Sequence, residues 1–291
     1  MTESRTHLLT FDVEHWYESY RHRNLSGWEN IHASDHLIVE KIFELLSKYQ
    51  QTATFFFTGR FAKEFPHVVI KCLEHGHEVA SHSYDHKVIY RMKNEDEFRK
   101  DLLTSIEILG NLIGKPILGY RAPKWSITAQ NQEWVFDVLL DAGLIYDSSF
   151  FPSPKADIYR NLGQPIEVLV NSGRSIIEIP ATGYNLKSLT IPVGGGLYFR
   201  AFPAWVTSMM LAQKELKEQE GMIYVHPYDL NIDNPQVSGG SLLFKMFRTY
   251  GVAGAWAKLE KILAKHRFTS IEQKLPTLNV NLVLNLRKNH G

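Results

Sequence analysis

The chain has 291 residues, of which 44% are hydrophobic and 22% are charged, a balance typical of a soluble globular protein and not of a disordered one. Its 32 Lys and Arg residues against 31 Asp and Glu residues give a net charge of +1, so the basic excess that binding to nucleic acid requires is missing. Length alone is compatible with one large α/β barrel or with two ordinary domains.

The sequence carries no sign of export. Cys72 is the only cysteine, which excludes an intrachain disulfide and gives no indication of an oxidising compartment. Only Leu8 and Leu9 precede Asp12 after a polar start, so no apolar core of a signal peptide can be drawn. No stretch reaches the roughly 18 apolar residues of a membrane span. We therefore expect a cytoplasmic protein without a membrane span, whereas its oligomeric state stays open.

Short apolar runs alternate with helical patterns along most of the chain. The runs that we predict as buried strands are residues 8–13, 52–57, 78–81, 117–120, 144–146, 175–179 and 222–225. Helices are predicted to begin after the capping residues Ser34, Asn94 and Thr128, and further helical patterns cover residues 203–219 and 241–266. This alternation predicts an α/β fold with a parallel sheet, closed or nearly closed into a barrel.

We expect a single domain over residues 1–291, in which residues from about 236 to 291 form a C-terminal helical extension packed on the barrel. In such a barrel the active site gathers at the carboxyl ends of the strands. Polar residues follow six of the seven predicted strands, and their joint placement is the argument for a site. They are Asp12, Glu14, His82, His86, Arg121, Asp147, Pro180, Thr182 and His226.

Asp12 and Glu14 are two residues apart, which in an extended strand directs both carboxylates to the same side. Because two neighbouring carboxylates repel each other, the pair indicates a metal ion between them or one carboxyl that stays protonated. An isolated pair of this kind is more often two solvated acids. His82 and His86 have a spacing that lets two imidazoles converge on one ion if the segment turns helically after the strand.

Arg121 follows a strand and precedes Pro123 by two positions, so its guanidinium is expected to pair with a carboxylate, for which a structural salt bridge is an equally good reading. Asp147 alone is equally compatible with a turn residue. His226 follows an apolar strand, where a histidine is as often a core residue as a catalyst.

Together these residues resemble the polysaccharide deacetylase superfamily (NodB homology, carbohydrate esterase family 4). Its signature runs from an Asp-containing strand through His-Ser/Thr-x-x-His, Arg-x-Pro and Asp to a late His. The resemblance covers residues 8 to about 235 and is strongest to the exopolysaccharide-locus deacetylases. The motifs that carry it are Phe-Asp-Val-Glu-His-Trp (11–16), Tyr-Asp-Ser-Ser (146–149), Glu-Ile-Pro (178–180), Gly-Gly-Gly-Leu-Tyr-Phe-Arg (194–200) and Val-His-Pro-Tyr-Asp (225–229).

The resemblance implies a distorted (β/α)7 barrel with a metal-dependent N-deacetylase site. Glu14, His82 and His86 are then the ligands of one divalent ion, zinc by default, with cobalt, nickel, manganese or iron as alternatives. The chain departs from the family pattern because Val13 occupies the usual position of the metal aspartate, so Glu14 must serve from two residues beyond Asp12. The aromatic Asp-Trp pair of the fourth family motif is also absent, which weakens the role of Asp147.

In the mechanism that follows, Asp12 is the general base and Arg121 orients it, while His226 is the general acid, tuned by Asp147. A backbone N–H near Lys124 is expected to share the oxyanion with the ion. The predicted substrate contacts are Trp16, Lys124, Trp125, Arg200 and Tyr228. The glycines at 194–196 before Arg200 are compatible with a mobile loop over the substrate or with a plain connection.

The predicted substrate is an N-acylated amino sugar, in a glycan or in a lipid-linked or nucleotide-linked precursor of a bacterial surface polysaccharide such as an O-antigen or exopolysaccharide. Two other functions stay open. A non-catalytic glycan-binding relative would explain Glu14 but not the joint retention of Asp12, Arg121 and His226. An amidase acting on a non-sugar amide, such as a cyclic ureide, could dispense with the ion, whereas this chain keeps both histidines.

Overall fold

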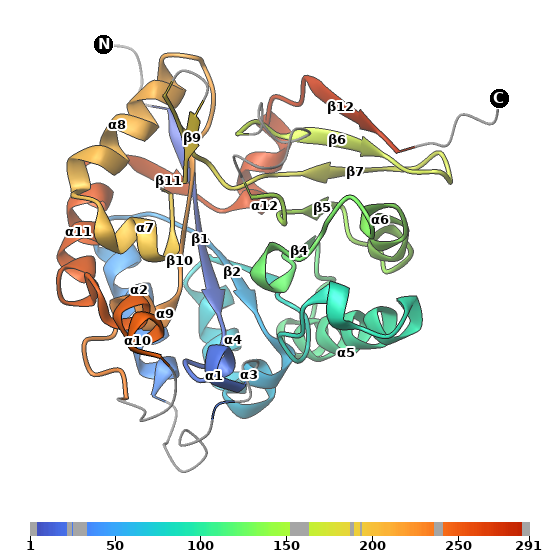
Figure 1. Ribbon diagram of the computed structural model, residues 1–291, viewed down its shortest axis with the longest axis horizontal. Helices are drawn as coiled ribbons and strands as arrows, with labels where there is room; N and C mark the ends of the chain where they lie inside the picture. Colours follow the sequence, from blue (N-terminus) through green and yellow to red (C-terminus); the bar gives the residue numbers. More distant parts are fainter. Residues whose placement is uncertain are drawn as a thin grey trace.

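The computed structural model describes residues 5–21, 25, 34–151, 163–186, 189–192, 194–235 and 241–286. Within these residues, ten strands form one sheet in the order β10-β1-β2-β3-β4-β5-β7-β6-β12, with β11 pairing with β1, while β8 and β9 form a separate pair (Figure 1). The strands are β1 (Thr6–Val13), β2 (Thr54–Phe57), β3 (Glu78–Ser81), β4 (Gly119–Tyr120), β5 (Tyr146–Asp147), β6 (Ile166–Leu169), β7 (Ser175–Glu178), β8 (Tyr184–Leu186), β9 (Leu189–Ile191), β10 (Met222–Val225), β11 (Arg267–Thr269) and β12 (Leu282–Asn285).

The helices lie outside the sheet, with α8 and α11 along β1 and β10 and with α5 and α6 beside β4 and β5 (Figure 1). They are α1 (Glu18–Arg21), α2 (Asp35–Lys48), α3 (Gly59–Glu64), α4 (Pro66–Glu74), α5 (Glu95–Ile113), α6 (Gln132–Asp141), α7 (Gly196–Ala201), α8 (Ala204–Glu215), α9 (Pro227–Leu230), α10 (Leu242–Thr249), α11 (Val252–Lys265) and α12 (Ile271–Lys274). Short 3-10 turns cover Ile89–Arg91, Pro123–Trp125 and Leu275–Thr277.

The seven strands that the sequence predicts lie next to one another and are parallel, in the order β10, β1, β2, β3, β4, β5 and β7. The α/β class with a parallel-rich sheet is therefore confirmed. β10, from late in the chain, pairs with β1, so the carboxyl ends of early and late strands meet at one edge. The antiparallel pair β6 and β7 and the edge strand β12 extend the sheet on its other side.

The strands read as continuous apolar runs because both of their faces are buried. In β2, Phe55 and Phe57 belong to the core cluster between the sheet and the helices, where Phe55 packs against Phe43 of α2 with ring centroids 5.0 Å apart. Phe56 points the other way, into a second cluster that contains Tyr146. The alternation of side chains along β2 thus places Phe55 and Phe57 on the side of the helices and Phe56 on the other face of the sheet.

Two of the three predicted helix starts are confirmed, and one is displaced. α2 begins directly after Ser34, and α5 begins after Asn94, whose side chain accepts the N–H of Glu97 at 3.0 Å. α6 begins at Gln132 and not after Thr128. Thr128 instead donates its N–H to the side chain of Asn131, the residue that precedes the helix, at 2.7 Å. Its segment therefore forms a turn before α6.

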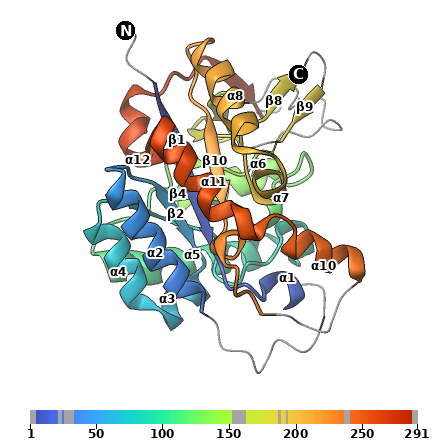
Figure 2. The same ribbon diagram turned by 90° about the vertical axis from the view of Figure 1, so that its left-hand side faces the viewer.

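The C-terminal region is more than a helical extension. α10 and α11 are separated at Gly251, which has a left-handed φ of 76°. After α11 the chain returns to the main sheet, where β11 pairs with β1 and β12 pairs with β6. Figure 2 shows α10 and α11 along one side of the molecule. Among the described residues, no helix has both the length and the apolarity needed to cross a membrane.

The glycines before α7 allow close packing against β10. A Cβ atom at Gly195 would lie 2.3 Å from the ring of Tyr224, and the N–H of Tyr224 donates to the carbonyl of Gly194 at 3.0 Å. A side chain at Gly195 would therefore force the two segments apart. Close packing of the backbone against β10 therefore accounts for glycine at these positions.

Candidate active site

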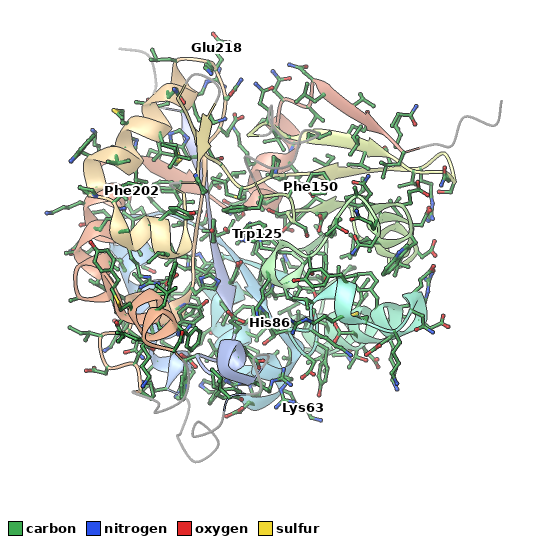
Figure 3. The ribbon with its side chains drawn as sticks, in the orientation of Figure 1. Lys63, His86, Trp125, Phe150, Phe202 and Glu218 are labelled. Carbon is green, nitrogen blue, oxygen red and sulfur yellow. The ribbon has the colours of Figure 1, made fainter. Side chains whose placement is uncertain are left out.

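Asp12 and Glu14 both lie at the carboxyl end of β1 and are almost completely buried. Their carboxylates reach the same neighbour, because Nε2 of His226 lies 3.8 Å from Oδ2 of Asp12 and 3.9 Å from Oε1 of Glu14. The two side chains thus point to the same side of β1, as their spacing of two residues predicts. Figure 3 shows His86 in the lower half of the view, below Trp125, whereas Glu218 lies at the top.

Arg121 holds one oxygen of Asp12 and is itself fixed from several sides. Its Nη1 atom lies 2.7 Å from Oδ1 of Asp12 and also donates to the hydroxyl of Thr10. Nε and Nη2 donate to the carbonyl and the hydroxyl of Ser148, and the guanidinium lies 4.1 Å from the ring centroid of Phe56. Burial is the largest single effect and opposes the charged form of Asp12, but Arg121, His82 and His226 together outweigh burial and hold the pKa of Asp12 below its usual value.

His82 and His86 come together, although not through a helical turn. Their ring centroids lie 5.0 Å apart, and both side chains are buried. The residues after β3 form a loop in which Ser83 and His86 have positive φ angles of 67° and 51°. This left-handed backbone, which is unusual for residues other than glycine, turns His86 back toward Glu14. Nε2 of His86 lies 2.7 Å from Oε2 of Glu14.

Backbone strain is concentrated around these groups. Among the described residues, six that are not glycine have positive φ, and four of them follow β3 or β4: Ser83, His86, Lys124 and Trp125. Such conformations cost free energy and persist where the surrounding structure imposes them, which is common at active sites. The two loops therefore support the placement of a functional site at this edge of the sheet.

His226 is held by Asp229, a residue that the sequence analysis did not single out. Nδ1 of His226 lies 2.9 Å from Oδ2 of Asp229, and Oδ1 of Asp229 lies 2.7 Å from Nε of Arg200. Burial alone would lower the pKa of His226, but the hydrogen bond and charge of Asp229, together with the charges of Asp12 and Glu14, outweigh burial and raise it. Asp229 follows His226 by three positions in the motif Val-His-Pro-Tyr-Asp, so its spacing at the start of α9 was the available signal.

Asp147, which was expected to tune His226, instead contacts Ser149 and Glu178. One of its oxygens accepts the hydroxyl of Ser149 at 2.6 Å, and it forms a buried pair with Glu178. Burial raises the pKa of both carboxyls, and the charge of Asp147 raises that of Glu178 further. The pair is therefore expected to share a proton. In the described structure it is Asp229, and not Asp147, that hydrogen-bonds to His226.

Arg200 was predicted to contact the substrate, but its guanidinium is engaged within the protein. Besides its ion pair with Asp229, Nη1 donates to the carbonyl of Tyr250 at 2.5 Å and Nη2 donates to that of Phe247 at 2.8 Å. These carbonyls belong to the carboxyl end of α10, where a cation offsets the partial negative charge of the helix. Arg200 therefore links α10 to the partner of His226.

The predicted aromatic contacts differ in exposure. Trp16 is 1% exposed, so its ring belongs to the core, and its backbone N–H donates to Oδ2 of Asp35. Tyr228 is stacked on the ring of His226 with centroids 4.6 Å apart, and its hydroxyl donates to Oε1 of Glu14 at 3.1 Å. Trp125, like Tyr228, is partly exposed, and it lies beside the guanidinium of Arg121, so these two aromatic residues are the ones that a ligand could meet.

Lys124 precedes Trp125 in the same loop after β4. It is exposed and has a φ of 53°, which sets the course of the backbone above Arg121. The oxyanion contact that we predict from this loop stays a prediction, because it concerns a bound substrate.

Glu14, His82 and His86 offer one carboxylate and two imidazoles, a set of donors that suits zinc and other divalent first-row ions. His82 donates through Nδ1 to the carbonyl of Arg121 at 2.8 Å, which leaves the lone pair of Nε2 available for an ion. Glu14 and His86 contact each other directly, so an ion would take the place of that contact. The chemistry of the three side chains therefore fits a divalent ion.

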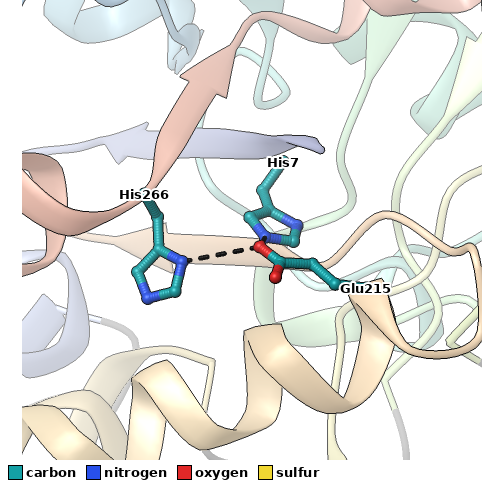
Figure 4. A group of neighbouring side chains, drawn as sticks. All are labelled: His7, Glu215 and His266. Carbon is teal, nitrogen blue, oxygen red and sulfur yellow. Dashed lines mark hydrogen bonds and ion pairs between the residues drawn. The ribbon is translucent and has the colours of Figure 1, made fainter. Parts of the chain in front are cut away.

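A tighter group of possible ligands lies elsewhere. Among the described residues, the ligand atoms of His7, Glu215 and His266 all lie within 4.8 Å of one another (Figure 4). Nδ1 of His7 accepts the N–H of Gly221, so the proton of the neutral ring is on Nε2, which lies 2.9 Å from Glu215. That proton occupies the lone pair a metal would need. We therefore interpret this group, at the start of β1, as structural hydrogen bonding.

Comparison with known families gives two matches along the chain. Residues 2–135 match the family described as polysaccharide deacetylase, and residues 148–276 match a domain of unknown function (DUF3473). Asp12, Glu14 and the residues from His82 to Arg121 lie in the first match. His226 and Asp229 lie in the second. The candidate site thus combines side chains from both matched regions.

Individual relatives cover only parts of the chain. It is 33% identical over 94 residues to the peptidoglycan-N-acetylglucosamine deacetylase of Bacillus cereus, which is 32% of this chain and 34% of that protein. It is 30% identical over 127 residues to the peptidoglycan deacetylase of Helicobacter pylori, which is 43% of this chain and 41% of that protein. The chain therefore spans well under half the length of these curated relatives.

Fold similarity extends further than sequence similarity. A crystal structure from Mycobacterium smegmatis, provisionally named a polysaccharide deacetylase, superimposes with a TM-score of 0.59 at 20% sequence identity. It covers 96% of this chain and 94% of its own chain, so the two share a fold over nearly their whole length. Residues 2–135 are thus similar to the polysaccharide deacetylase family, and the named deacetylases are similar to parts of this chain.

Proposed function

We propose that this protein is a metal-dependent hydrolase that removes an N-acyl group, acetyl by default, from an amino sugar. The observation that carries the proposal is the pairing of a base with an acid in one buried site. Asp12 has one oxygen held by Arg121 and the other facing His226, and His226 has one nitrogen held by Asp229 and the other facing Asp12. Each group therefore keeps one atom for proton transfer.

Asp12 is suited to accept a proton through Oδ2. Arg121 occupies Oδ1 and keeps the carboxylate ionised, so Asp12 enters the reaction as a base. A divalent ion held by Glu14, His82 and His86 would supply an acidified water and polarise the acyl carbonyl. The proton of that water would pass to Oδ2 of Asp12.

His226 is suited to donate a proton through Nε2. Asp229 holds Nδ1 and favours the imidazolium, so the proton on Nε2 is available for a leaving amine. An amine leaves poorly unless it is protonated, which makes this second proton transfer as necessary as the first. Binding without catalysis would require neither the orienting Arg121 nor the orienting Asp229.

We also propose that the substrate is a precursor of a bacterial surface polysaccharide, met in the cytoplasm, and that the ion is zinc. The resemblance of the motifs around Asp12 and His226 to exopolysaccharide-locus deacetylases supports the substrate. The single buried thiol of Cys72 is compatible with a reducing compartment. Fractionation of the native protein between cytoplasm and periplasm tests the location.

The decisive experiment is an assay for released acetate and formate from N-acylated amino sugars in polymeric, lipid-linked and nucleotide-linked form. The protein is loaded with zinc, and the Asp12→Asn variant serves as the control for contaminating activity. Release that depends on Asp12 and stops in strong chelator supports the proposal. A zinc-loaded protein that binds these glycans and releases no acyl group from any of them is a binding protein, which contradicts it. Full activity in chelator would contradict the metal-dependent step.

A further inference from the structure

α10 carries an exposed stripe of large apolar side chains. Its members are exposed by between 49% and 76%, and no residue of the helix is buried. Their spacing of three and four residues places them on one helical face. Figure 2 shows α10 at the margin of the molecule, near α1. The residues of this α10 stripe are Leu242, Leu243, Met246, Phe247 and Tyr250.

The opposite side of α10 attaches the helix to the candidate active site. Arg248 donates to the carbonyl of Trp16 at 2.8 Å, and its guanidinium lies 4.1 Å from the ring centroid of Tyr228. Phe244 packs against the cluster of Trp16 and Tyr17. Arg200 binds the carbonyls at the carboxyl end of the helix. The inner face is therefore fixed by specific contacts, and these contacts direct the α10 stripe away from the protein.

The charges of α10 indicate what covers the stripe. The helix contains no acidic residue, and Lys245 lies beside the stripe, whereas Arg248 belongs to the inner face. A helix with an apolar face of Leu, Met and Phe, a lysine beside that face and no negative charge is suited to the interface of an anionic bilayer. A contiguous exposed apolar patch on a folded protein usually marks a site that binds another molecule or a membrane.

We propose that α10 docks onto the surface of an anionic lipid bilayer, with the α10 stripe in the boundary between headgroups and acyl chains. Tyr228 contacts both Arg248 of α10 and Glu14 of the candidate site, so docking brings the site to the membrane surface. Lipid-linked glycans are found there. Vesicle binding is measured without substrate, so its result is independent of the proposed deacetylase function.

The first test is sedimentation of the protein with vesicles of phosphatidylcholine, with and without phosphatidylglycerol. We expect binding to require phosphatidylglycerol and to weaken at high salt. The double variant Leu243→Ser/Phe247→Ser should bind at least about tenfold more weakly, because it removes two large apolar groups from the bilayer. Lys245→Glu should weaken binding about fivefold or more. Trp205→Ser, at a site on α8 that is 63% exposed, is the matched control and should bind like the unaltered protein.

The second test places a probe on the helix itself. Because Cys72 is the only cysteine and is buried, an environment-sensitive dye can be attached at Leu243→Cys. Its emission should shift toward that of an apolar environment when vesicles are added, whereas a dye at Leu216→Cys, 87% exposed directly after α8, should not respond. Unchanged sedimentation of the double variant, or equal emission at both positions, overturns the proposal. A third outcome would also overturn the proposal. If the protein does not bind vesicles and elutes as a dimer in size-exclusion chromatography, and the double variant elutes as a monomer, the stripe joins two copies of the chain.

Discussion

Oδ2 of Asp12 lies 3.8 Å from Nε2 of His226, although Asp12 lies in β1, the first strand of the chain, and His226 follows β10, late in the chain. The pairing of β1 with β10 creates this proximity, because parallel neighbours end at the same edge. The other oxygen of Asp12, Oδ1, accepts a hydrogen bond from Arg121, and the other ring nitrogen of His226, Nδ1, is hydrogen-bonded to Asp229. Their roles can therefore be separated by changing one holding residue at a time.

Asp12→Asn should lower kcat by ~100-fold or more on any substrate that the protein hydrolyses, because it removes the base and keeps the shape of the side chain. The amide oxygen can still accept from Arg121, so the variant should remain folded with its ion content unchanged. Steady-state kinetics, elemental analysis and circular dichroism measure the three quantities. Near-native turnover in a folded variant would show that another group takes the proton.

Asp229→Asn should move the alkaline limb of the rate profile to lower pH. The Asp229 carboxylate raises the pKa of His226, so in the unaltered protein the imidazolium persists to higher pH. Removal of that charge lets His226 lose its proton earlier as the pH rises, and turnover should fall by about tenfold at the original optimum. The measurement is kcat against pH.

The control for this variant is Asp233→Asn, an exposed position shortly after α9. It changes the net charge equally but does not touch His226, so its rate profile should match that of the unaltered protein. A parallel shift in both variants would indicate a general charge effect instead of a direct one. Loss of activity in Asp229→Asn without any shift would mean that Asp229 acts only through Arg200 and the packing of α10.

Much of the fold could be predicted because its central strands are buried on both faces. Continuous apolar runs such as that of β2 depend little on their neighbours, and all seven predicted parallel strands are present. β6 and β12 have alternating burial and lie at the margin of the sheet, so their pairing is decided by tertiary contacts. A pattern search has no access to such contacts.

The sequence predicts which residues form the candidate site better than it predicts which of their side chains contact each other. Asp12, Glu14 and His226 could be predicted from their positions at strand ends, because the carboxyl ends of parallel strands lie at one edge of the sheet for any conformation of the loops. Which carboxylate faces His226 depends on side-chain direction at the start of α9, and there Asp229 is three residues away. Arg200 likewise follows a glycine-rich motif that pointed to a ligand, yet its partners are carbonyls at the end of α10.

Asp35→Asn should remove part of the dependence of stability on pH. Burial raises the pKa of Asp35 from 3.8 to about 7, against a weaker opposing effect of its hydrogen bond from Trp16. Because the folded pKa lies above the unfolded one, the neutral carboxyl stabilises the fold at low pH, and this stability is lost as pH rises from about 4 through about 7. The loss is up to about 4 kcal/mol.

The free energy of unfolding, measured by urea titration at several pH values, gives the comparison. The difference between Asp35→Asn and the unaltered protein should grow in favour of the variant as pH rises. Asp96→Asn is the matched control, since Asp96 also lies in the first turn of a helix but is exposed. Parallel curves for Asp35→Asn and the unaltered protein would show that folding does not raise the pKa of Asp35.

Glu14→Gln should weaken the binding of the divalent ion, because a neutral amide oxygen is a poorer donor than a carboxylate. Glu14 contacts His86 through one oxygen and accepts from Tyr228 through the other, so a side chain of equal length preserves the packing. Activity should return when the ion is supplied in excess, since mass action compensates for weaker binding. Titration of activity against zinc concentration measures this rescue.

Glu14→Asp provides the matched variant, because it keeps the charge and shortens the side chain by one methylene. Its need for excess zinc should be smaller than that of Glu14→Gln if charge matters more than reach. Asp12→Asn should behave differently from both, since a lost base cannot be restored by any concentration of zinc. If zinc rescues Asp12→Asn and fails to rescue Glu14→Gln, the two carboxylates have the opposite roles, with Asp12 as the ligand and Glu14 as the base.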